Sequence, residues 1–178
     1  MKHKLLKTAI VLLCCLFILS FRSITIKRLP EFFAYSFSCV DPATGKIKAK
    51  LQPNTAIKQR AKGKTSTAVT YLLEGSKSSV RLKFEDSYFD MLSDIQTSSL
   101  NPMLYIGFHK LTSGKNRRTL VIDPNSGENV IGFNLSPVET NIYRILVGGT
   151  LQAGEYAFID KTTTTPEGHM MVWTFGID

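Results

Sequence analysis

Cysteine and histidine, the residues that most often bind metals or act in catalysis, are scarce in this chain. Three of the 178 residues are cysteines and three are histidines. Cys14 and Cys15 lie in an apolar N-terminal run, which leaves Cys39 as the one cysteine in the rest of the chain. One cysteine cannot form an internal disulfide, so the fold must rest on its apolar core, where we expect Cys39 to be buried.

The motifs of the common catalytic and metal sites are also missing. His109 and His169 belong to no His-Glu-x-x-His or Cys/His array, which argues against a zinc site. The chain has no Gly-x-Ser-x-Gly nucleophile elbow, no Ser-x-x-Lys and no glycine-rich phosphate loop. Asp123-x-Asn125-x-Gly127 resembles part of a calcium loop but lacks the distal glutamate, so we interpret it as a turn.

These absences predict a protein with no catalytic, cofactor-binding or metal-binding residues. His109 lies opposite Ile106 and Phe108 in an alternating segment, and we interpret it as an exposed or half-buried strand residue. His169 begins the last strand beside a loop, and the same interpretation applies to it.

Acidic residues are absent from residues 44–70, although the chain has 14 of them. The basic stretch from Lys46 to Lys64 carries seven lysines and arginines, and in residues 46–51 the lysines alternate with apolar residues. One interpretation is a site for an acidic polymer or a membrane surface. We favour a solvated edge strand followed by a loop, because no aromatic residues are interleaved with the charges and lysines block edge-to-edge pairing.

The net charge does not indicate a nucleic-acid partner. The formal charge is +8, but four of the 22 basic residues lie in the first 26 residues and all 14 acids lie beyond them, which leaves +4. A charge this small over about 150 residues is too mild to predict nucleic-acid binding.

The N-terminal residues resemble an export signal. Lys2, Lys4 and Lys7 precede fourteen uncharged, mostly apolar residues at positions 8–21. As a helix this run is about 21 Å long, short of the roughly 30 Å hydrocarbon core of a bilayer. We predict a signal peptide or signal anchor over residues 1–26 and one domain over 27–178. Because no Ala-x-Ala cleavage site is present, an uncleaved single-pass anchor and a buried N-terminal element stay open.

Short runs with alternating or β-branched residues recur along the rest of the chain, separated by Gly, Pro, Asp and Asn turns such as residues 41–45. They predict about nine or ten strands in an all-β, antiparallel fold, since the chain has no room for the crossover helices of a parallel sheet. A strand over residues 129–135 is expected to break at Ser136-Pro137. Residues 86–95 permit a short helix that would carry Asp86, Asp90 and Asp94 on one side.

The last 28 residues are predicted to form a long hairpin that contains the only tryptophan, Trp173. Leu151, Gly154 and Tyr156, at its start, resemble the tyrosine corner of immunoglobulin-like and fibronectin-type-III-like sandwiches. This resemblance implies an antiparallel immunoglobulin-like β-sandwich in which the Tyr156 phenol binds the backbone upstream. With the leader, the chain is similar to uncharacterised bacterial exported proteins, and the resemblance implies no particular activity.

The sequence therefore favours an exported, non-enzymatic binding or structural module of the bacterial cell envelope. Its partner would be a protein or another envelope component, reached through a surface such as the turn from Lys161 to Gly168, with membrane contact only through the leader. One alternative is an envelope glycan hydrolase that uses carboxylates among Asp86, Asp90 and Asp94. The other is a membrane-anchored assembly subunit that retains its leader.

Overall fold

A computed structural model describes residues 35–59, 67–83, 88–93, 101–165 and 167–178. These residues form twelve β-strands and one 3-10 turn at Pro102–Leu104, with no α-helix among them. The prediction of an all-β fold with antiparallel sheets is confirmed, with more strands than expected. The leader predicted over residues 1–26 lies outside the described residues. No helix in the described part of the chain is long and apolar enough to span a bilayer.

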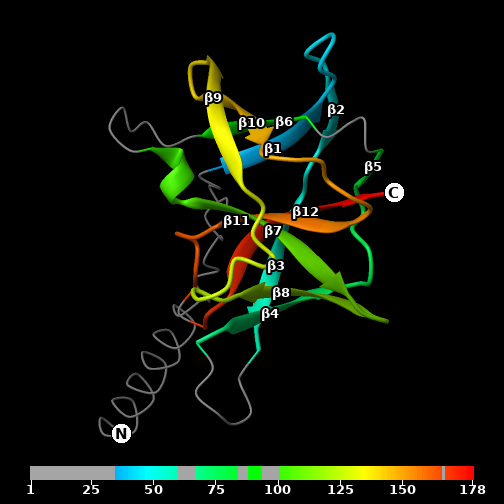
Figure 1. Cartoon of the computed structure of the whole chain (residues 1–178), viewed down its shortest axis with the longest axis vertical. Helices are drawn as coiled ribbons and strands as arrows, with labels where there is room; N and C mark the ends of the chain where they lie inside the picture. The colour runs from blue at the N-terminus through cyan, green and yellow to red at the C-terminus, as the bar shows by residue number, and fades with distance from the viewer. Residues whose placement is uncertain (1–34, 60–66, 84–87, 94–100, 166) are drawn as a thin grey trace, which may run out of the picture. The chain divides into compact units, whose positions relative to one another are not determined.

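One sheet has five antiparallel strands in the order β2–β1–β6–β10–β9 (Figure 1). Their bounds are β1 Tyr35–Val40, β2 Ile47–Lys50, β6 Phe89–Ser93, β9 Phe133–Glu139 and β10 Ile142–Val147. The lysine-bearing strand β2 lies at one edge, which confirms the interpretation of an edge strand. Strand β9 is the other edge and continues through Pro137 instead of breaking there, because an edge strand tolerates a residue without an N–H.

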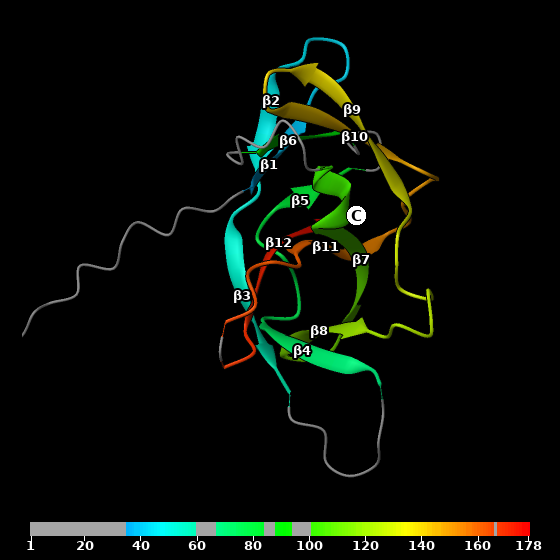
Figure 2. The same ribbon diagram turned by 90° about the vertical axis from the view of Figure 1, so that its left-hand side faces the viewer.

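The other sheet closes into a six-stranded barrel. Its strands are β3 Pro53–Lys58, β4 Val69–Glu74, β7 Ile106–Ser113, β8 Arg117–Ile122, β11 Gly154–Asp160 and β12 Met170–Ile177. They follow the order β11–β7–β8–β4–β3–β12, and β12 pairs again with β11 (Figures 1 and 2). Strand β5, Arg81–Leu82, adds a short parallel pair to β12. The sequence analysis did not predict this closure, which removes the free edges of an open sheet.

The terminal hairpin β11–β12 lies between two apolar cores. Tyr156, Phe158, Trp173 and Phe175 face the five-stranded sheet, where Phe37, Phe89 and Cys39 also lie buried. The rings of Phe37 and Phe158 stack there with centroids 4.6 Å apart. The alternate residues of the hairpin point into the barrel and pack with its other apolar side chains: Ala157, Ile159, Met170 and Val172. The hairpin predicted from the sequence is therefore the element that both cores share.

Two segments differ from the sequence analysis. The spacing of residues 86–95 left a short helix open, but residues 89–93 form strand β6 between β1 and β10, with Phe89, Met91 and Ser93 buried. Pairing on both edges and burial of alternate side chains outweigh a spacing that also permits a helix. Residues 53–58, expected in a loop after β2, form β3, which carries the chain from the five-stranded sheet into the barrel (Figure 2).

The tyrosine-corner contact predicted from residues 151–156 is present. The Tyr156 hydroxyl donates a hydrogen bond of 2.7 Å to the carbonyl oxygen of Gln152, and Tyr156 is 2% exposed. Replacing Tyr156 with phenylalanine leaves that carbonyl without its partner, so we expect the free energy of unfolding to fall by about 1–3 kcal/mol. Urea denaturation monitored by Trp173 fluorescence measures this change. Tyr88→Phe, at a tyrosine that is 43% exposed, is the control, and equal stabilities of the two variants would contradict the prediction.

Candidate functional site

The strand pair β4–β8 completes the barrel by pairing with β3 on one side and with β7 on the other. Both of these pairings are short, and we call each of them a seam. The two strands pair with each other along six residues, from Val69–Ile122 to Glu74–Arg117. In contrast, β3 pairs with β4 at only two positions and β7 pairs with β8 at only two positions. Beyond these pairs the neighbouring strands diverge, and a cavity lies at each seam.

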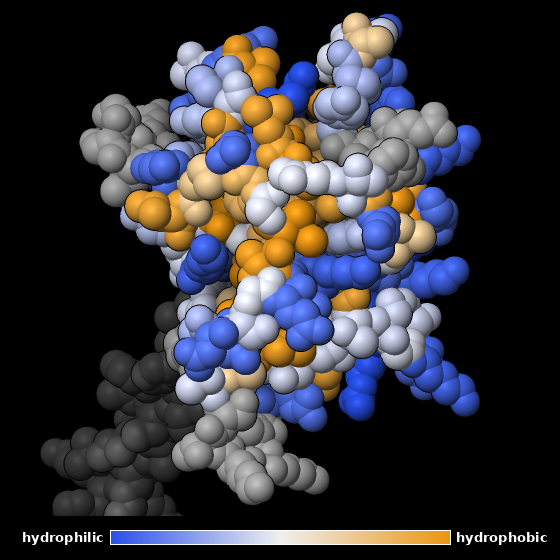
Figure 3. All heavy atoms as spheres, in the orientation of Figure 1, coloured by the Kyte–Doolittle hydropathy of each residue, from blue (hydrophilic) through white to orange (hydrophobic). Residues whose placement is uncertain are grey.

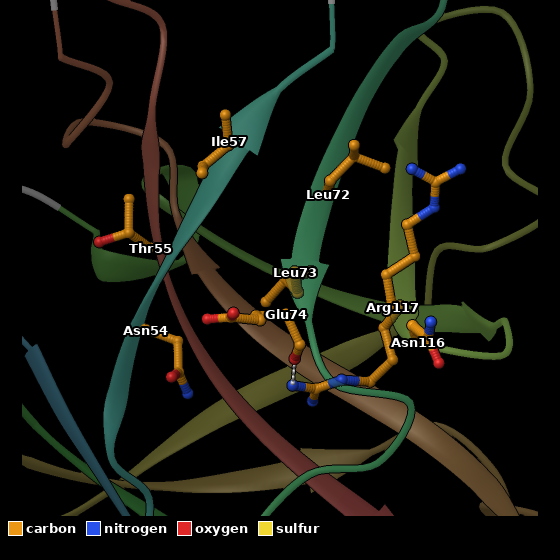
Figure 4. Close-up of a pocket in the computed structure, with 9 residues that line it drawn as sticks. Asn54, Thr55, Ile57, Leu72, Leu73, Glu74, Asn116 and Arg117 are labelled. Atoms are coloured by element: carbon orange, nitrogen blue, oxygen red, sulfur yellow. Dashed lines mark hydrogen bonds between the residues drawn. The ribbon is translucent and has the colours of Figure 1, made fainter.

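The cavity at the β3–β4 seam has a volume of about 540 Å³ and is lined by both polar and apolar side chains (Figure 4). Figure 4 shows the carboxylate of Glu74 pointing across the gap towards β3, while Arg117 lies on the other side of β4. Glu74 and Arg117 are exposed to solvent. The neighbouring Arg118 is buried and donates a 3.0 Å hydrogen bond to the Glu74 carbonyl oxygen. The charges that this groove presents to solvent are therefore those of Glu74 and Arg117.

The cavity at the β7–β8 seam has a volume of about 530 Å³ and is lined mostly by apolar side chains. The lining residues are Val69, Tyr71, Met103, Ile106, Gly107, Phe108, His109, Ile122, Val130, Ile131, Gly132, Phe133, Ile159, Lys161 and Met170. The segment that leads into β9 covers part of β7 here, since Ile131 N–H donates 2.8 Å to the Phe108 carbonyl. Figure 3 shows apolar atoms gathered on the face where β9 and this segment lie.

His109 is the polar side chain buried in this cavity. It follows the alternation of β7 into the barrel, where it is 5% exposed, and its Nδ1 atom is buried without a hydrogen-bond partner. Burial, and to a smaller extent the positive charge of Lys161, together lower the pKa of His109 from 6.5 to about 4. The imidazole is therefore neutral at pH 7.

The expectation that His109 is exposed or half-buried is wrong. Only the closure of the barrel covers the second face of β7, and alternation along one strand carries no information about closure. Gly107 leaves the space that this packing needs, because a Cβ there would lie 2.7 Å from Ile159 Cγ1 and 3.0 Å from His109 Nε2. The glycine two positions before the histidine is the signal that could have indicated a crowded interior.

Lys161 lies at the rim of the same cavity, at the start of the turn proposed from the sequence as a candidate surface. Its backbone N–H donates 2.8 Å to the Tyr105 carbonyl, and its side chain is exposed. Its ammonium forms no ion pair within the described part of the chain. The structure thus brings His109 and Lys161, which are 52 positions apart in the sequence, to one cavity, while His169 is not among the lining residues.

The two described carboxylates among those considered in the sequence analysis, Asp90 and Asp123, both have hydrogen-bond partners within the protein. Asp90 binds Arg144 through both oxygens, at 2.7 and 3.0 Å, and Asp86 and Asp94 lie outside the described residues. Asp123 caps its own turn by accepting a 2.9 Å hydrogen bond from Asn125 N–H, as the turn interpretation predicts. Among the described residues, no three His, Cys, Asp or Glu side chains gather to hold a metal ion.

Sequence reasoning missed a buried ionic cluster inside the barrel. Glu155 follows the alternation of Ala157 and Ile159 into the interior and is 4% exposed. Its Oε2 atom accepts hydrogen bonds from the N–H (2.7 Å) and hydroxyl (2.5 Å) of Ser78, and lies 3.7 Å from Arg118 Nη1. Its Oε1 atom pairs with Arg81. Burial lowers the pKa of Arg118, although the charge of Glu155 opposes this shift.

The arginines of this cluster also bind groups outside the barrel interior. Arg118 donates to the Gly75 carbonyl at 3.1 Å, and Arg81 pairs with Asp178. Hydrogen bonding to Asp178, and then to Glu155, raises the pKa of Arg81. The cluster ties the segment before β5 to β8, β11 and β12, so its role is structural. In the sequence, the signal for this buried cluster is an acidic residue, Glu155, within the apolar run of β11.

Comparison of the chain with protein-family models, with curated proteins and with solved structures found no match.

Proposed function

We propose that this protein is an exported, non-enzymatic binding module of the bacterial cell envelope whose ligand enters the cavity at the β7–β8 seam. The observation that carries the proposal is the His109 imidazole, buried in an apolar cavity with no partner for Nδ1. A buried polar atom without a partner costs about 1–3 kcal/mol, and a ligand that binds it removes this cost. Apolar cavities with a few convergent polar groups, at barrel mouths among other places, are typical ligand sites.

Export is proposed from the N-terminal sequence, where three lysines precede a fourteen-residue apolar run. The alternative of a membrane-anchored assembly subunit differs in the fate of this leader. N-terminal sequencing of the exported protein separates the two, since an intact Met1 in the membrane fraction supports the anchor. The periplasm or the outside of the cell is the proposed location.

The alternative of a glycan hydrolase has less support. Both oxygens of the Asp90 carboxylate accept hydrogen bonds from Arg144, so the guanidinium occupies the atoms that would have to contact a substrate. Its two companions in that hypothesis, Asp86 and Asp94, lie outside the described residues.

A relationship to immunoglobulin-like or fibronectin-type-III-like sandwiches is likewise a proposal. The hydrogen bond from Tyr156 to Gln152 supports it, as does the packing of two antiparallel sheets over one aromatic core. The closed second sheet differs from the open sheets of those sandwiches.

A neutral, apolar naphthylamine dye tests the binding function. We expect saturable binding with a fluorescence increase in the wild-type protein, and loss of it in Val130→Asp, which places a charge at the rim of the cavity. Val138→Asp is the matched control, because Val138 on β9 is 48% exposed, close to the 50% of Val130, and does not line the cavity. Absence of saturable binding, or equal loss in both variants, contradicts the proposal.

A further inference from the structure

The side chains that line the cavity at the β7–β8 seam restrict the kind of chemical group that can fill it. Val69, Tyr71 and Ile122 come from the strand pair β4–β8, and Ile159 and Met170 come from the terminal hairpin. These side chains offer dispersion contacts and few hydrogen bonds, so a polar body such as a sugar would lose its hydration without compensation. A volume of about 530 Å³ suits an alkyl chain or a small ring system.

The polar groups of the cavity restrict the head of the ligand. Lys161 is the one fully charged side chain among the lining residues, and its ammonium forms no ion pair within the described ranges. It lines the same cavity as the imidazole of His109, and its positive charge contributes to the lowered pKa of that imidazole. An anionic group bound in this cavity can accept hydrogen bonds from the ammonium and from an imidazole N–H.

We propose that the ligand is an amphiphile with a single carboxylate head group, bound by Lys161 and His109, and with an apolar body that fills the seam cavity. This inference rests on the proposed binding function and names its ligand class. A single cation matches a single negative charge, which favours a carboxylate over a doubly charged phosphate. The open rim at Val130, which is 50% exposed, leaves room for the ligand to enter.

Displacement of the naphthylamine dye by dodecanoate, dodecanol and dodecyl phosphate, below their micellar concentrations at pH 7.5, tests this class. We expect dodecanoate to displace the dye at concentrations about tenfold lower than dodecanol does. A gain in affinity of about this size is expected from one charge-assisted hydrogen bond. Lys161→Gln should abolish this advantage, while Lys161→Arg keeps it. Lys46→Gln, which removes an exposed lysine of the β1–β2 turn, is the charge-matched control and should also keep it.

Three results would overturn the ligand class: equal displacement by dodecanoate and dodecanol, tighter binding of dodecyl phosphate, or an advantage that survives in Lys161→Gln. In each case the dye still binds, so the proposed function stands while this inference fails. Failure of the dye and of all three amphiphiles to bind the wild-type protein contradicts the proposed function itself. Dodecanoate should change the ring signals of His109 in NMR spectra of the wild-type protein, and unchanged ring signals would contradict the placement of the head group.

Discussion

Replacement of Glu155 by glutamine is expected to lower the free energy of unfolding by about 3–5 kcal/mol. The carboxylate is the partner of two arginines and of Ser78, and Arg118 beside it has a side chain that is 5% exposed. Without the negative charge, the guanidinium of Arg118 stays buried with no compensating ion. Arg81 is affected less, because its side chain is 28% exposed and it keeps Asp178.

Urea denaturation at pH 7.5, monitored by the fluorescence of Trp173, measures this loss. Glu128→Gln removes the same charge from an exposed turn and should change stability by less than about 0.5 kcal/mol. The double variant Glu155→Leu with Arg118→Met should be more stable than Glu155→Gln, because it leaves no guanidinium buried without an anion at that position. A loss below about 1 kcal/mol in Glu155→Gln would show that the cluster is solvated rather than buried.

Acidification is expected to destabilise the protein through His109 by about 2–3 kcal/mol between pH 7.5 and pH 4.5. The pKa of His109 is about 4 in the folded protein, against an ordinary value of 6.5 that applies to the unfolded chain. Between these values the unfolded chain binds a proton that the folded protein excludes, so lower pH favours unfolding. The stabilisation is fully present above pH 6.5 and is lost as the pH falls towards 4.

The same urea experiment at several pH values checks this dependence. His109→Gln removes the titrating group and should flatten the slope between pH 6.5 and pH 4.5. Because folded-state carboxylates also contribute at lower pH, the difference between this variant and the wild-type protein is the relevant quantity. Identical slopes in the variant and the wild-type protein would mean that the imidazole reaches solvent in the folded protein.

Local patterns in the sequence predicted the elements whose conformation is set by residues close to them in the chain. The turn at residues 41–45 forms because the Asp41 carboxylate binds the N–H groups of Ala43 and Thr44 and Gly45 adopts a φ of 68°. The hairpin β11–β12 and strand β4 follow their β-branched and aromatic residues. All these signals act within a few residues of the chain.

Prediction from the sequence failed where a distant segment decided the outcome. Strand β6 pairs with β10, whose residues lie 50 to 56 positions later in the chain, and this pairing decides against the helix that its spacing also permits. His109 and Glu155 both lie on strand faces that point into the barrel, and their burial follows from the closure of the barrel over those faces. No periodicity within β7 or β11 could report that closure.

The sequence alone thus determined the β character of the chain, its turns, its terminal hairpin and the Tyr156 contact, because those depend on neighbouring residues and on alternation. Only the tertiary structure decided that one sheet closes, that Glu155 meets Arg118 inside it, and that His109 and Lys161 share a cavity. The physical reason is that closure depends on pairing between strands far apart in the chain, whereas hydrophobic alternation records only that a face is covered.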